Sequence, residues 1–67
     1  MHPSTTAILR YFEYAHLPPR LRDVSAPFSA LAQKLAVTLE GPELTVALRK
    51  LLESKDAAVR AALDLES

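Results

Sequence analysis

The residues of this chain with the most chemical potential gather near its start. Three of its four aromatic residues fall within four positions, and three arginines and a histidine stand beside them. The group comprises Arg10, Tyr11, Phe12, Tyr14, His16, Arg20 and Arg22. Aromatic rings stack on nucleobases and guanidinium groups fork onto phosphates, so this combination suits a nucleotide ligand. The alternative is that Phe12 and one tyrosine belong to the core and the arginines form a solvated rim.

The charge distribution also places any anion-binding site in the first third of the chain. The formal net charge is zero, which argues against binding to duplex DNA, where several phosphates must be neutralised. Residues 1–22 nevertheless carry three arginines against Glu13, a balance of +2, and the remainder carries five basic and seven acidic residues.

The sequence offers little to catalysis. It contains no Gly-rich phosphate loop and no nucleophile with an evident base, and its serines read as helix caps or exposed positions. There is no cysteine, and the two histidines, His2 and His16, are far apart. Glu53 and Asp56 are three apart and read as a solvated helix face. We expect no catalytic residue, no metal site and no cofactor.

Length limits how stable a single copy can be. A chain of 67 residues makes one domain, and so short a domain has marginal stability unless a further interaction, such as a disulfide, stabilises it. Without cysteine no disulfide can do so, which leaves self-association. No apolar run approaches the roughly 20 residues that span a bilayer, and the start lacks the features of a signal peptide. We therefore expect a soluble, intracellular homo-oligomer that contacts no membrane.

Apolar spacing predicts an all-α fold with helices over about residues 4–15, 20–39 and 43–64. Ser4 or Thr5 can cap the first helix, and the prolines after His16 end it. The segment 40–42, Glu-Gly-Pro, contains the only glycine, suited to a left-handed position, and a proline suited to a first turn. So short a link makes the second and third helices an antiparallel hairpin, with the first helix packed over it.

The second helix contains a proline, and two interpretations compete. Ser25 can cap a new helix that starts near Ala26, or Pro27 can kink one continuous helix. The apolar phase runs unbroken from Val24 to Phe28, which favours the kink.

Apolar periodicity also predicts which faces are buried. The expected apolar stripes are Ile8, Leu9, Phe12 and Ala15 in the first helix, Leu21, Val24, Phe28, Leu31, Leu35 and Leu39 in the second, and Leu44, Leu48, Leu51, Leu52, Val59, Ala62 and Leu63 in the third. Two long arms and one short cover cannot enclose a full core. The leftover apolar and alanine-rich surface, which includes Ala57 and Ala61, is therefore expected to mediate self-association.

Two segments carry a resemblance to a known family. RYFEYAHLPPRLRDVSAPF, residues 10–28, and GPELTVALRKLLESKDAAVRAAL, residues 41–63, resemble the small anti-CBASS cyclic-oligonucleotide sponges of bacteriophages. The resemblance spans about residues 10–63. It rests on the order and spacing of an aromatic-x-Tyr element, then His and Pro, then a helical hairpin whose second arm begins with Pro-Glu.

The resemblance implies an all-helical hexamer in the host bacterial cytoplasm. Such sponges bind cyclic di- and trinucleotides without cleaving them and so block host CBASS signalling. It also implies that Tyr14 stacks on a base and that Arg20 or Arg22 engages the ligand. Tyr11 and His16 of the aromatic and basic cluster are further candidates. Two departures stand out: Ala15 separates Tyr14 from His16, and Leu44 follows Glu43 where a basic residue is expected. The second departure puts a trinucleotide site at the subunit junction in doubt.

A second class of function stays open from the residues alone. The chain can instead be a small helical interaction module that binds a partner protein through its apolar surface and binds no nucleotide. Exposure of Tyr14 distinguishes the two, because a ligand platform is exposed in the free protein.

Overall fold

The computed structural model describes residues 2–66, with the side chains of residues 2–64, and its regular elements in this range are helices joined by two short links. Helix α1 spans Pro3–Leu9 and continues into a 3-10 turn, η1, over Arg10–Phe12. Helix α2 spans Pro19–Thr38 and α3 spans Pro42–Glu66. The expected all-α fold class is confirmed.

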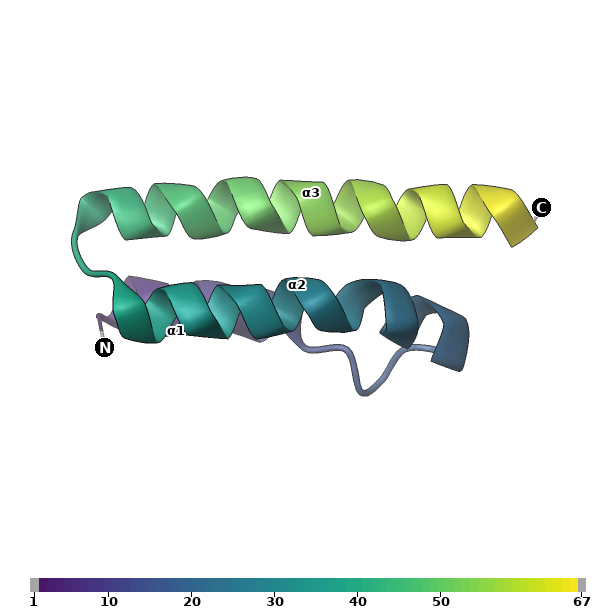
Figure 1. The fold of residues 1–67 in the computed structure, drawn as a ribbon, viewed down its shortest axis with the longest axis horizontal. Coiled ribbons are helices and arrows are strands. Elements are labelled where there is room, and N and C mark those ends of the chain that lie inside the picture. Colours follow the sequence, from purple (N-terminus) through teal and green to yellow (C-terminus); the bar gives the residue numbers. More distant parts are fainter. Residues whose placement is uncertain (1, 67) are drawn as a thin grey trace.

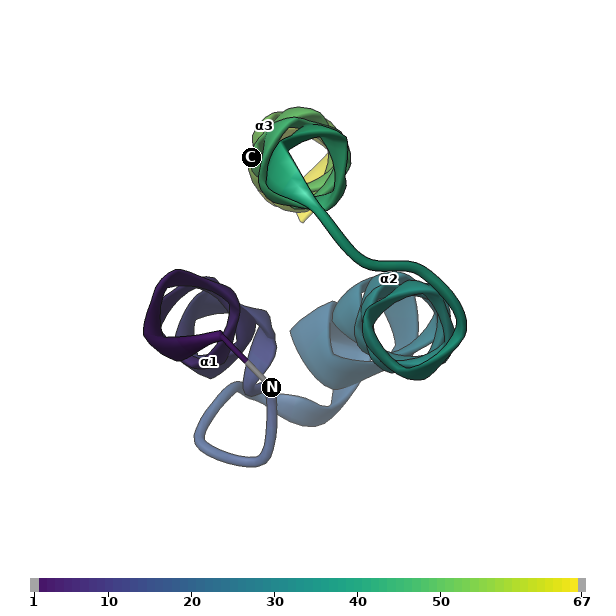
Figure 2. The ribbon, with the colours of Figure 1, turned by 90° about the vertical axis from the view of Figure 1, so that its left-hand side faces the viewer.

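The two long helices lie side by side and run in opposite directions (Figure 1). Helix α1 lies behind α2 in that view, and seen from the end the three helices stand at the corners of a triangle (Figure 2). The described part of the chain measures 40 × 19 × 16 Å. Because α1 and η1 are short, they accompany only part of α3.

The first helix ends earlier than the expected boundary of residue 15. Glu13 takes an extended conformation, with φ −63° and ψ 138°, and begins the segment that leads to α2. This segment reverses the direction of the chain, so the helix cannot continue to Ala15. The cap also differs from the expected Ser4 or Thr5: His2 is the N-cap, and its Nδ1 accepts a hydrogen bond from the Ser4 backbone N–H at 3.1 Å.

Helix α2 passes through Pro27 without a break, as the apolar phase predicts. Proline has no N–H to donate to the carbonyl of Asp23 one turn earlier. Pro27 and Asp23 are both exposed, so water can solvate that carbonyl. The exposed position explains why the helix tolerates the proline.

A short link joins α2 to α3. Leu39 leaves the helical conformation with φ −118° and ψ 161°, and Gly41 has φ +96°, in the left-handed region that the sequence predicts for it. The Leu44 N–H then donates to the Gly41 carbonyl at 3.1 Å and starts α3.

The core lies where all three helical segments meet. Phe12, Ala32, Leu44 and Leu48 form its buried centre, and half-buried side chains pack around it. Those side chains are Ile8, Leu9, Phe28, Leu35, Leu51 and Leu52. In the first and third helices this matches much of the expected apolar stripes, although Ala15 and Leu63 are exposed.

Helix α2 corrects the expected buried face. Its buried residues are Leu21, Ser25, Ser29, Ala32 and Ala36, whereas Leu31 and Leu39 are each 45% exposed. Small side chains let α2 approach two other helices at once, and its larger apolar residues then flank the contact. Apolar periodicity predicts that the face with the large apolar residues points inward. In α2 close packing decides instead, and the face with the small residues points inward.

Candidate functional site

A hollow opens where α1 and η1 end and α3 continues. Its volume is about 390 Å³. The walls come from the end of η1, the segment that leads to α2, and the second half of α3. The residues that line it are Arg10, Tyr11, Glu13, His16, Leu17, Lys55, Asp56, Val59 and Arg60. We call it the Tyr11 hollow.

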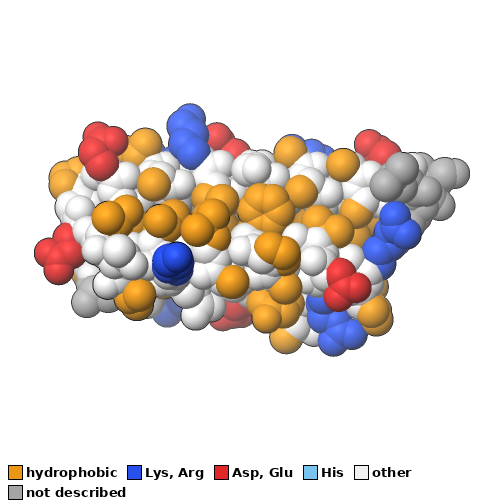
Figure 3. Space-filling model, viewed as in Figure 1, with side chains coloured by type: hydrophobic (Ala, Val, Ile, Leu, Met, Phe, Trp, Pro, Cys, Tyr) orange, Lys and Arg blue, Asp and Glu red, His pale blue; other side chains and the backbone are white. Residues whose placement is uncertain are grey.

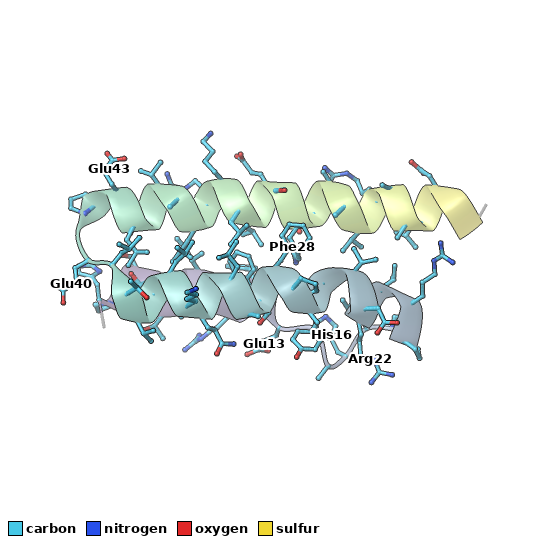
Figure 4. All side chains as sticks on the ribbon, in the orientation of Figure 1. Glu13, His16, Arg22, Phe28, Glu40 and Glu43 are labelled. Carbon is cyan, nitrogen blue, oxygen red and sulfur yellow. The ribbon has the colours of Figure 1, made fainter. Side chains whose placement is uncertain are left out.

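Two of the five residues singled out from the sequence line this hollow. Tyr11 belongs to η1 and is 66% exposed, and His16 is an exposed residue of the following turn. Glu13 and His16 both project from the segment between α1 and α2, whereas Arg22 belongs to the first turns of α2 (Figure 4).

The other three predicted site residues lie outside the lining of the hollow. Tyr14 is 36% exposed, and its carbonyl accepts from the Leu17 N–H at 3.0 Å, which closes the turn. Arg20 is exposed in the first turn of α2, and Arg22 is half-buried there. Among the described tyrosines, Tyr11 rather than Tyr14 therefore lines a hollow with several cations.

Sequence reasoning missed the residues that α3 contributes to this hollow, and Lys55 is the one with a hydrogen bond to η1. Its side chain is only 12% exposed, and its Nζ donates to the Tyr11 carbonyl at 2.8 Å. That carbonyl stands at the end of a helical segment, where backbone oxygens lack intrahelical donors and a cation is favourable. Lys55 thus caps η1 from α3, although 44 residues separate it from Tyr11.

The sequence did contain a signal for Lys55. Leu44, Leu48 and Ala62 mark the buried face of α3, and Lys55 falls in the middle of that face at spacings of seven. A lysine inside an apolar stripe needs a partner for its ammonium group. The net positive charge of residues 1–22 pointed to the first third of the chain instead, and Lys55 lies outside it.

The charges of the Tyr11 hollow favour an anion that also carries a ring. Three cationic side chains, Arg10, Lys55 and Arg60, face two carboxylates, Glu13 and Asp56, which leaves a balance of +1. Asp56 Oδ1 lies 3.2 Å from Lys55 Nζ. The exposed ring of Tyr11 adds a stacking surface beside these cations.

A larger hollow of about 1000 Å³ lies at the other end of the molecule, where α2 passes into α3. Apolar side chains make up much of its wall, including Val37, Val46 and Leu39, and no phenylalanine or tyrosine is among the described residues that line it. Glu40 and Glu43 both belong to this end of the molecule (Figure 4). Its chemistry suits apolar contact more than recognition of a charged ring compound.

Apolar side chains also line the joint between the two long helices, on the face turned away from α1 (Figure 3). Phe28 projects into this joint (Figure 4), and it packs half-buried on the core together with Leu35 and Leu51. Leu31, 45% exposed, follows Phe28 on the same side of α2. We call Phe28, Leu31, Leu35 and Leu51 the apolar seam.

The described part of the chain offers neither a cluster of metal ligands nor a membrane-spanning helix. Residues 2–64 contain no cluster of three or more His, Asp or Glu side chains that could hold a metal ion. None of the described helices combines the length and the apolarity of a membrane span.

Comparisons with protein-family models, with curated proteins and with solved structures found no match to this chain.

Proposed function

We propose that this protein is a non-enzymatic sponge for cyclic di- or trinucleotides, with the Tyr11 hollow as its ligand platform. Sequestering such a messenger in the cytoplasm of a bacterial host lowers its free concentration. The resemblance to phage anti-CBASS sponges suggests that the signalling blocked in this way is the CBASS response of the host. The protein needs no catalytic group for this role, because tight binding alone removes the signal.

The observation that supports the proposal is the position of Tyr11. Tyr11 is 66% exposed and lines a hollow where Arg10, Lys55 and Arg60 gather. Exposed aromatic rings beside cations bind single-stranded nucleotides by stacking and by phosphate contacts. His16 on the same wall adds a hydrogen-bonding ring.

Self-association belongs to the same proposal. The large side chains of the apolar seam stay half-exposed in a single copy. A chain of 67 residues can bury only a limited apolar surface by itself, and contact with a second copy would bury these side chains further. The resemblance implies a hexamer. Light scattering should therefore give a mass several times the 7.4 kDa of one chain at micromolar concentration; a mass of one chain would remove self-association from the proposal.

Calorimetric titration of the purified protein tests the binding function. The panel consists of cyclic di-AMP, cyclic di-GMP, cyclic GMP-AMP and cyclic tri-AMP, with linear AMP as the control. We expect at least one cyclic nucleotide to bind in the micromolar range or tighter, and chromatography of the bound ligand to recover it uncleaved. Binding of no member of the panel would reject the sponge.

The apolar seam favours a second candidate, a helical module that binds a partner protein and no nucleotide. Half-exposed Phe28 and Leu31 would then contact a helix of that partner. The same titration separates the candidates, because an interaction module shows no heat with any cyclic nucleotide.

A further inference from the structure

The ammonium group of Lys55 is held in place by the fold. One of its three N–H groups donates to the Tyr11 carbonyl at 2.8 Å, and its side chain is only 12% exposed. The stem lies on the buried face of α3, between Leu48 and Ala62. The fold therefore fixes this cation at the backbone carbonyl of Tyr11, a residue whose own surface is exposed.

The counter-ion of Lys55 is held far less firmly. Asp56 Oδ1 lies 3.2 Å from Lys55 Nζ, but the Asp56 side chain is 49% exposed. A half-exposed carboxylate can turn toward water at small cost, because water solvates it well and surface ion pairs are weak. Asp56 can thus leave while Lys55 remains.

A phosphodiester matches the place that Asp56 occupies. Both groups are anions that present two oxygens to an N–H donor, and a phosphate that pairs with Lys55 has its nucleoside within reach of the Tyr11 ring. One nucleotide ligand can therefore contact Lys55 through its phosphate and Tyr11 through its base.

We infer that Lys55 is the phosphate-binding residue of the Tyr11 hollow, and that Asp56 stands in for the ligand phosphate in the free protein. This inference rests on the proposed function. In the bound state the ammonium keeps its hydrogen bond to the Tyr11 carbonyl, and the phosphate replaces the Asp56 carboxylate. Asp56 is accordingly a built-in competitor, and removing its charge strengthens binding.

The test uses the cyclic nucleotide of the panel that the unchanged protein binds most tightly. Lys55→Met keeps the apolar stem and removes the charge, and should weaken binding about tenfold. Lys55→Arg restores a cation and should recover most of the affinity. Asp56→Asn should tighten binding about threefold at low salt, and the gain should shrink at high salt.

Glu53→Gln is the matched control for Asp56→Asn. It removes the same charge from the same helix, but Glu53 pairs with Lys50 at 3.6 Å and does not line the hollow. If both substitutions tighten binding equally, net charge explains the gain and Asp56 is not a competitor. Circular dichroism and melting curves check that each variant is folded.

The remaining outcomes are distinct. If Lys55→Met binds as tightly as the unchanged protein, Lys55 is not the phosphate ligand, while the sponge function stands. If Lys55→Met weakens binding but Asp56→Asn does not tighten it, Asp56 does not stand in for the phosphate and the inference is wrong. If the unchanged protein binds no member of the panel, the proposed function fails and this inference fails with it.

Discussion

The two halves of α3 pack in different ways. In the first half, Leu44 and Leu48 are buried against Phe12 and Ala32, and no charged residue interrupts the inward face. In the second half the inward face carries Lys55, and half-buried Val59 lines the Tyr11 hollow. The first half of α3 thus contributes to the apolar core, and we call it the closed half. The second half lines the polar Tyr11 hollow, and we call it the open half.

The length of the first helical segment explains this difference. Phe12 is the last residue of η1 and the last side chain that this segment places in the core. Beyond it, a turn replaces the helix beside α3, and a turn covers less surface. The hydrogen bond from Lys55 to the Tyr11 carbonyl lies between the two regions, next to Phe12 of the core and at the wall of the hollow.

Helix α2 does not share this contrast. Because α2 and α3 run in opposite directions, the start of α2 lies beside the end of α3 (Figure 1). Buried Leu21 and Ser25 come from the first half of α2, and buried Ser29, Ala32 and Ala36 come from the second. Apolar and polar residues are thus both buried in each half of α2, and the contrast between a core end and a polar end belongs to α3.

The largest expected effect tests the closed half. Leu48 is fully buried, so Leu48→Ala should lower the free energy of unfolding by about 2–5 kcal/mol through lost burial and a cavity. Val59→Ala, at a half-buried position of the open half, should cost about 1 kcal/mol. Urea unfolding followed by circular dichroism measures both. Equal losses would show that the two halves are packed alike.

The next effect tests the open half through ligand binding. Tyr11→Ala should weaken binding of a cyclic nucleotide by about 1–3 kcal/mol, because it removes the stacking ring, and should leave the melting temperature nearly unchanged. Tyr14→Ala is the matched control, since Tyr14 lies outside the lining of the hollow. Calorimetry compares the two variants. A loss confined to Tyr14→Ala would return the platform to the residue that the sequence favoured.

The smallest effect concerns the buried serines. Ser25 is fully buried and its Oγ has no hydrogen-bond partner, so Ser25→Ala should raise the free energy of unfolding by about 1 kcal/mol. Ser29→Ala should gain less, because Ser29 Oγ accepts from Gln33 Nε2 at 3.3 Å. Thermal melts of both variants measure the difference. A destabilised Ser25→Ala would mean that the hydroxyl has a favourable partner such as water.

The sequence by itself determined the elements of this protein. Helical spacing, the prolines and the single glycine predicted the all-α class, the continuity of α2 through Pro27 and the left-handed Gly41. These features depend on residues a few positions apart, and local sterics and hydrogen bonding decide them. The aromatic and basic cluster also pointed to Tyr11 and His16, two residues of the candidate site.

Only the tertiary structure decided how those elements face one another. It turned Ser25 and Ala32 of α2 inward in place of the larger Leu31, ended the first helix before Ala15, and brought Lys55 to the Tyr11 carbonyl. The physical reason is that the rotation of a helix depends on the shapes of its partners, which lie far away in the chain. Periodicity within one helix carries no information on a neighbour 44 residues away.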